Sequence, residues 1–212
     1  MHFKTNGNFS GASRAVFLIF LLFLFCAEVS SEKIPFKSYT TAEGLAHDRV
    51  NRIVRDSRGF LWFCTSEGLS RFDGYEFKNY RSDEGLPHRS VMDFLETRDG
   101  GKLWLATGDG IVLFNPAGVA KNAAQSDKPE MFRVFRDEDL KDDTKSQIVI
   151  DLLEDRNGTI WAAAENGLYQ YALAENNQAR LMRVFDKRDG LIADHWMNEL
   201  LETADGRIFV TV

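Results

Sequence analysis

The sequence predicts an all-β fold built from repeated four-stranded units, and three observations lead to this fold class. Phe is abundant, with 17 residues, and aromatic residues make up 12% of the chain, which suits β-strands. A second observation is a pattern that occurs four times, marked by the aromatic residues Trp62, Trp104, Trp161 and Phe209. The third is a glycine three positions before each marker. Repetition at this spacing is typical of solenoids, propellers and similar arrays.

The first repeat, residues 50–80, is predicted to contain four short strands. Residues 50–56 alternate apolar and polar side chains, and the glycine at position 59 then allows a turn. Residues 60–65 are mostly apolar, as expected for a strand buried on both faces. Asp73-Gly74 is a favoured pair for a two-residue hairpin. A four-stranded meander of this length, when repeated, is the sequence signature of a β-propeller blade.

The remaining repeats give about three and a half antiparallel blades. Residues 91–136 form the second blade, residues 148–186 the third, and residues 197–212 the start of a fourth. The second copy is longer, with a polar, Ala-rich insertion at 115–131 that predicts an extended hairpin between its third and fourth strands. Residues 34–40 match the pattern of an outer strand and are expected to act as an outer closing strand. The tryptophans are expected to pack between neighbouring blades.

The N-terminus predicts export. Lys4 and Arg14 precede thirteen uncharged residues, 15–27, which is the length of the apolar region of a signal peptide and less than the ~20 residues of a spanning helix. Residues 1–31 are therefore predicted to be a signal peptide that is cleaved after Ser31, and the chain is predicted to be periplasmic. The alternative is an uncleaved membrane anchor.

Composition and motifs exclude several functions. The formal net charge is −6, and no cluster of Lys and Arg is present, so nucleic acid is not expected as a partner. The sequence contains no Gly-x-Ser-x-Gly elbow, no His-Glu-x-x-His, no phosphate-binding glycine-rich loop and no Cys-x-x-Cys. We therefore predict no catalytic residues, no metal and no cofactor, and we do not expect this chain to be an enzyme.

Several short blocks closely resemble the two-component regulator propeller repeat. They are Gly59-Phe-Leu-Trp62, Thr65-Ser-Glu-Gly-Leu69 and Arg71-Phe-Asp-Gly74, and the similarity extends over residues 35–212. The resemblance implies an extracytoplasmic ligand-sensing module of a two-component signal transduction protein, present here as an N-terminal fragment. It implies longer relatives with further blades, a membrane span and an output module such as a histidine kinase. It also implies membrane association through those missing regions, or through an uncleaved N-terminus, and allows a homodimer of the full-length protein.

The candidate ligand site is a polar rim. Loops between successive blades, and loops between second and third strands, are expected to share one face, where arginine, acids and histidine suit a polyhydroxylated or anionic small ligand. The resemblance implies carbohydrate as the ligand class. The candidate residues are His47, Asp48, Arg49, Glu67, His88, Arg89, Asp109, Glu165, Asn166, His195 and Trp196.

Other interpretations remain open at the level of sequence. Three histidines from successive blades could bind a metal, although a metal-free polar rim is favoured. Trp196 either stacks on a sugar or begins the core of the fourth blade, and the core position is favoured. The alternative functions are a propeller lyase or hydrolase, a protein-interaction scaffold, or a gene remnant without function.

Overall fold

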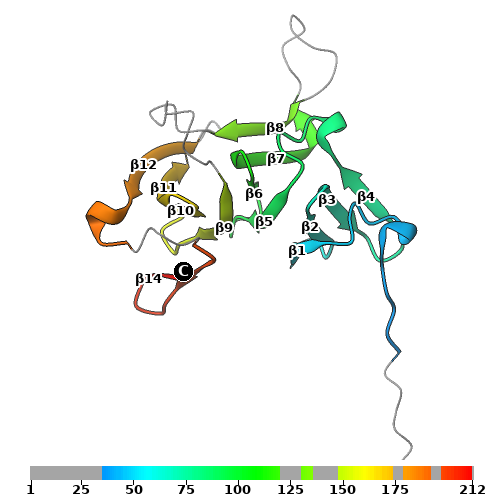
Figure 1. Ribbon diagram of the computed structural model, residues 1–212, viewed down its shortest axis with the longest axis horizontal. Coiled ribbons are helices and arrows are strands. Elements are labelled where there is room, and N and C mark those ends of the chain that lie inside the picture. The colour runs from blue at the N-terminus through cyan, green and yellow to red at the C-terminus, as the bar shows by residue number, and fades with distance from the viewer. Residues whose placement is uncertain (1–34, 120–129, 136–147, 174–178, 192–196, 212) are drawn as a thin grey trace, which may run out of the picture. The chain divides into compact units, whose positions relative to one another are not determined.

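The strands form successive antiparallel sheets in chain order, which confirms the predicted all-β propeller fold (Figure 1). The computed structural model describes residues 35–119, 130–135, 148–173, 179–191 and 197–211. The predicted signal peptide lies outside these ranges. Within them, no helix combines the length and the apolar character needed to cross a membrane.

Blade 1 is a four-stranded meander with its strands in sequential order. The strands are β1 (Val50–Arg55), β2 (Leu61–Thr65), β3 (Gly68–Phe72) and β4 (Phe77–Tyr80). At the hairpin between β3 and β4, Asp73 Oδ1 accepts hydrogen bonds from the backbone N–H groups of Tyr75 and Glu76, both at 2.9 Å. This aspartate therefore stabilises the turn that the Asp-Gly pair predicts.

Blades 2 and 3 repeat the meander, and blade 4 is described as a two-stranded sheet. Blade 2 contains β5 (Val91–Glu96), β6 (Leu103–Thr107), β7 (Gly110–Val119) and β8 (Glu130–Phe135). Blade 3 contains β9 (Val149–Glu154), β10 (Ile160–Ala164), β11 (Gly167–Leu173) and β12 (Ala179–Phe185), and blade 4 contains β13 (Glu199–Glu202) and β14 (Ile208–Thr211). β7 and β8 pair as far as Val119 and Glu130, so they form the base of the predicted long hairpin; its tip lies outside the described residues.

Short 3-10 helices occur in the segments that lead into the blades. They are η1 (Thr41–Glu43), η2 (Ser82–Glu84) and η3 (Lys187–Asp189), and each is followed by a glycine. The first strands β1, β5, β9 and β13 contact one another in sequence, while β4, β8 and β12 lie on the outside (Figure 1). The first strands are therefore the inner strands of the blades.

The predicted outer closing strand is absent from the described part of residues 34–40. Residues 35–40 have no regular secondary structure. A strand requires backbone hydrogen-bond partners in a sheet, and each described sheet is built from other segments. The Tyr39 ring instead packs edge-on against Phe72 and Phe77 of blade 1, with centroid distances of 5.0 and 5.6 Å.

The three tryptophan markers of the repeat pack between blades, as predicted. Trp62 is fully buried and stacks on Phe94 of blade 2, with ring centroids 4.8 Å apart. Trp104 is also fully buried, and it shares a hydrophobic cluster with Leu152 of blade 3. Trp161 packs against the cluster that contains Leu200 of blade 4. In the described residues, each blade is thus held to the next by a large apolar contact.

Candidate functional site

The loops predicted to form the rim do lie together in blades 1 to 3. In each blade, a backbone N–H in the turn between the second and third strands donates to a carbonyl just before the inner strand. Ser66 N lies 3.3 Å from Arg49 O, Gly108 N lies 3.4 Å from Ser90 O, and Glu165 N lies 3.1 Å from Ile148 O. These bonds place both kinds of loop at the same end of each blade.

Several predicted rim side chains hold their own loops. His47 Nδ1 accepts a hydrogen bond from the Arg49 N–H at 2.9 Å, and Asp48 Oδ1 accepts one from the Thr41 N–H at 2.7 Å. Asn166 Oδ1 accepts from the Tyr169 hydroxyl at 2.8 Å. These contacts position the loops. They also engage polar side-chain atoms of residues that were predicted from the sequence to contact a ligand.

His88 packs closely against the neighbouring turn of blade 2. Its Nδ1 accepts a hydrogen bond from the Ser90 N–H at 3.1 Å. A Cβ atom at Gly108 would lie 2.3 Å from His88 Cε1, so the imidazole needs a glycine at that position. In the described residues, no three His, Cys, Asp or Glu side chains are grouped so that they could hold a metal ion.

One predicted pair bridges two blades at the rim. Arg89 Nη1, before blade 2, lies 2.8 Å from Glu67 Oε1 in blade 1, and 70% of the Arg89 side chain is exposed. Asp109 and Glu165 lie in the equivalent turns of blades 2 and 3. His195 and Trp196 lie outside the described residues.

A charged cluster that was not predicted from the sequence lies on the inner strands. The Arg52 side chain on β1 reaches the acidic side chains that occupy the equivalent position on the other three inner strands. Its Nε is 3.2 Å from Asp93 Oδ1, its Nη2 is 3.3 Å from Asp151 Oδ1, and its Nη1 is 3.9 Å from Glu199 Oε1. We call these four residues the inner-strand cluster. It brings one ionisable side chain from each blade to a single place.

The two aspartates of the cluster are buried and also join blades. Asp93 Oδ2 accepts a hydrogen bond from Leu152 N of blade 3 at 3.1 Å, and Asp151 Oδ2 accepts one from Leu200 N of blade 4 at 2.7 Å. Their side chains are 4% and 3% exposed, whereas 43% of Arg52 is exposed. Asp93 Oδ1 has the Arg52 charge beside it but receives no hydrogen bond.

Burial changes the acidity of both aspartates. Loss of solvation, together with the charge of Asp151, raises the pKa of Asp93 to about 7, although the charge of Arg52 opposes the shift. Loss of solvation also raises the pKa of Asp151, while its bond to Leu200 N–H and the charge of Arg52 act against it. The cluster can therefore hold or release a proton close to neutral pH.

A signal in the sequence could have revealed this cluster. Arg52, Asp151 and Glu199 each precede the aromatic marker of their repeat by ten positions. Asp93 precedes Trp104 by eleven, because the second repeat has one extra residue in its first turn. A charged residue at the same place in four successive inner strands is unexpected for purely structural packing, because charged side chains are rarely buried without a partner.

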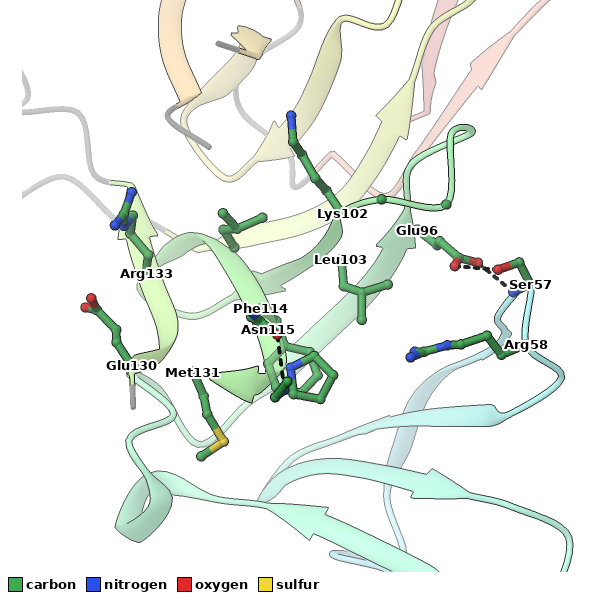
Figure 2. A pocket seen from close by; sticks show the side chains of 15 residues that line it. Ser57, Arg58, Glu96, Lys102, Leu103, Phe114, Asn115, Glu130, Met131 and Arg133 are labelled. Atoms are coloured by element: carbon green, nitrogen blue, oxygen red, sulfur yellow. Dashed lines mark hydrogen bonds between the residues drawn. The ribbon is translucent and has the colours of Figure 1, made fainter. Parts of the chain in front are cut away.

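A separate cavity of about 440 Å³ lies between blades 1 and 2. Figure 2 shows Arg58 extending toward it from the β1–β2 turn, with Phe114 and Met131 on its other sides. Ser57 closes one side through hydrogen bonds from its N–H and hydroxyl to Glu96, at 2.6 and 2.7 Å. The Arg58 guanidinium is already bound to Asp56, at 2.9 Å. The predicted rim residues do not line this cavity.

Comparison with known proteins identifies the type of repeat. A family model described as two component regulator propeller matches residues 44–67. A protein named histidine kinase P4 from Formosa agariphila is 39% identical over 66 residues, which are 30% of this chain and 5% of the kinase. The chain therefore spans a small fraction of this relative.

Solved structures share the fold. The extracellular domain of BT3049, a predicted hybrid two component system of B. thetaiotaomicron, superposes with a TM-score of 0.62 at 22% identity, over 82% of this chain and 22% of that domain. A streptogramin B lyase superposes with a TM-score of 0.52 at 13% identity, over 79% of this chain and 49% of the lyase. At these identities the similarity shows the fold alone, and the fold is shared by sensors and enzymes.

Proposed function

The chain carries a repeat of the two-component regulator propeller type, and from this premise we propose that it is the ligand-sensing propeller of an extracytoplasmic, periplasmic sensor. The observation that carries the proposal is the inner-strand cluster, in which four successive blades each direct a charged side chain to one place. A site assembled from several blades suits sensing, because a ligand bound there contacts all of them and favours one arrangement of the blades.

The chemistry of the cluster favours a small ligand rich in hydroxyl groups. The cluster has one cation, Arg52, and three carboxyl groups, so its acceptors outnumber its charged donors. Asp93 Oδ1 receives no hydrogen bond in the structure, and a buried acceptor of this kind gains from a hydroxyl donor. Arg52 has an exposed guanidinium that donates to ligand oxygens. A carbohydrate presents both kinds of group, so we propose this class.

The rim would form the entrance to the site. Arg89 and Glu67 pair across blades 1 and 2 on an exposed surface, where such pairs contribute only about 0–1 kcal/mol to stability. Breaking this pair therefore has a low cost, and both side chains can turn to a ligand. His88 and Asp48, which hold loops, would shape the entrance rather than contact the ligand.

A binding experiment tests the proposal. The chain without residues 1–31 is titrated calorimetrically with neutral and acidic oligosaccharides, and we expect saturable binding of one class. Arg52→Lys keeps the charge but loses the planar fork, so we expect affinity to fall by about tenfold or more. Arg180→Lys, an exposed change on β12, is the matched control and should bind normally. Failure of every oligosaccharide to bind, or equal binding by Arg52→Lys, contradicts the proposal.

The same samples separate a sensor from a propeller lyase or hydrolase. After long incubation, the recovered oligosaccharide is examined by mass spectrometry. We expect it unchanged, since no catalytic motif was found in the sequence. A cleaved product that disappears with Arg52→Lys would favour the enzyme alternative.

A further inference from the structure

The long hairpin of blade 2 builds a wall that blade 1 lacks. In blade 1, the short turn with Asp73-Gly74 joins β3 to β4, whereas β7 of blade 2 continues for ten residues, Gly110–Val119. The pairing of β7 with β8 shifts between Phe114 and Val119, so β7 has extra residues there. Such a bulge bends a strand and redirects its side chains. Residues 115–117 of this bulge line the cavity between blades 1 and 2.

The blade 2 side of the cavity is shaped and apolar. Asn115 Oδ1 accepts a hydrogen bond from the Ala117 N–H at 3.1 Å, which fixes the bulge, and Pro116 between them has a restricted φ. Beside the bulge, Leu103 on β6 pairs in register with Phe114 on β7, and these residues are 7% and 2% exposed. A ligand therefore meets a preformed apolar surface on this side.

Blade 1 contributes a charged side chain, Arg58, whose orientation is fixed. Its guanidinium binds Asp56 Oδ2 through Nε at 3.2 Å and Nη2 at 2.9 Å, and the Asp56 side chain is fully buried. Figure 2 shows the guanidinium extending toward the cavity. Its remaining nitrogen, Nη1, donates to none of the described residues. The N–H groups of Nη1 are therefore available to an acceptor in the cavity.

A second guanidinium adds positive charge beside Arg58. The Arg58 and Arg71 guanidiniums both lie over the Phe60 ring, with their Cζ atoms 5.5 and 4.4 Å from its centroid. Arg71 Nε is buried and has no hydrogen-bond partner in the described part of the chain. Asp56 balances one of these two charges. Because a buried cationic donor without a partner is costly, this side of the cavity favours an anion.

Cations also outnumber acids among the described residues that line the cavity. The charged ones are the cations Arg58, Lys102 and Arg133 and the acids Glu96 and Glu130. Both carboxylate oxygens of Glu96 already accept hydrogen bonds from Ser57. Lys102 and Arg133 extend away from Arg58 (Figure 2), so they add positive charge to the surroundings and not a second contact at Arg58. The cavity is thus locally positive in a chain whose formal net charge is −6.

We propose that this cavity binds a small organic carboxylate with an apolar body. The carboxylate accepts hydrogen bonds from Arg58 Nη1, and the body lies against Leu103, Phe114 and Met131. A charge-assisted contact of this kind is stronger than one between neutral groups. The volume of about 440 Å³ lies within the range of roughly 300–1,000 Å³ that is usual for small-molecule sites. None of the four residues of the inner-strand cluster lines this cavity, so the site is a second one.

Calorimetric titration of the full chain tests the class of ligand. The probes are phenylpropionate, phenylbutyrate and octanoate, and we expect saturable binding of at least one. The corresponding amide has the same body without the charge, so it should bind about tenfold more weakly. Acetate has the charge without the body and should not bind measurably. The proposal is overturned if no carboxylate of the panel binds, or if the amide binds as tightly as its carboxylate.

Arg58→Gln locates the contact with the carboxylate. Asp56 still accepts from Trp62 Nε1 and from two backbone N–H groups, so the turn should keep its shape. We expect the affinity for the carboxylate to fall by about tenfold or more. Arg180→Gln, the same change at an exposed position on β12, is the matched control and should bind normally.

Ala117→Glu tests the opposite wall without changing Arg58. Ala117 is exposed and lines the cavity, so the substitution should not affect folding, and it places a like charge near the bound carboxylate. We expect clearly weaker binding, whereas Ala117→Gln, of the same size without the charge, should lose less. Binding equal to that of the natural chain, by either Arg58→Gln or Ala117→Glu, would show that the carboxylate does not lie in this cavity.

Discussion

The Asp151 carboxylate on β9 accepts a hydrogen bond from the Leu200 N–H on β13, with Leu200 N 2.7 Å from Asp151 Oδ2. Asp93 on β5 makes the same bond to Leu152 N on β9. The residues that form the candidate site are therefore also the residues that fix how consecutive inner strands lie together. A ligand that changes the charge or position of these carboxyl groups acts directly on the contact between blades.

Removal of the Asp151 acceptor should weaken the contact between blades 3 and 4. Asp151→Ala leaves the buried Leu200 N–H without a partner, so we expect the free energy of unfolding to fall by about 1–3 kcal/mol. Asp151→Asn keeps a carbonyl oxygen for that N–H and should lose clearly less. Urea unfolding of both variants measures the difference, and equal losses would show that this hydrogen bond is not the cause.

The raised pKa of Asp93 predicts that stability decreases as pH rises. Between the ordinary value of 3.8 and about 7, the unfolded chain loses the Asp93 proton while the folded chain retains it. The unfolded state is therefore favoured increasingly across this window, and the contribution is constant above it. Asp56 and Asp155 have lowered pKa values, so they make stability rise with pH. This opposite effect occurs below pH 3.8 and therefore lies outside the window.

This pH dependence can be measured by urea unfolding at several pH values between 4.5 and 8. The groups facing Asp93 are Arg52 and Asp151, with Glu199 on the far side of Arg52. Asp93→Asn removes the titrating group and should flatten the decline. If stability of the natural chain is level or increases over this window, the interpretation is wrong.

Two buried tryptophans should respond differently to replacement by Phe. Trp62 Nε1 donates to Asp56 Oδ2 at 3.0 Å, whereas the buried Trp104 Nε1 has no hydrogen-bond partner. Trp62→Phe loses a charge-assisted hydrogen bond, so it should cost about 1–2 kcal/mol more than Trp104→Phe. Unfolding monitored by circular dichroism compares them, and a larger loss for Trp104→Phe would contradict the assignment.

Two glycines with positive φ differ in the space around them. Gly68 has φ of 133°, and a Cβ there would lie 2.7 Å from the Tyr80 carbonyl oxygen. Gly74 has φ of 105° with no atom within 4 Å of the added Cβ. Both Ala variants carry backbone strain, but Gly68→Ala must also move β4, so it should lose at least about 1 kcal/mol more. Thermal unfolding of both variants checks this difference.

The rim shows how far loop positions can be predicted from sequence. The repeat predicted that Arg49, Glu67 and Asp109 would lie at the same end of their blades, because a meander returns each kind of loop to a fixed end. It did not show that the side chains of His47 and Asp48 bind their own loops. Local hydrogen bonds depend on loop conformation, which the pattern of strands does not specify.

The fold class, the order of the strands and the burial of Trp62 and Trp104 could be predicted from the amino-acid sequence, because they depend on short-range periodicity and on apolar residues that must leave water. Which charged residues contact one another depends instead on how the blades pack in three dimensions. Arg52 and Asp151 come together because the inner strands of three blades converge, and each residue alone reads as an ordinary polar position in a half-buried strand. The tertiary structure also left residues 35–40 without a strand, because a strand depends on a partner in space and not on its own sequence.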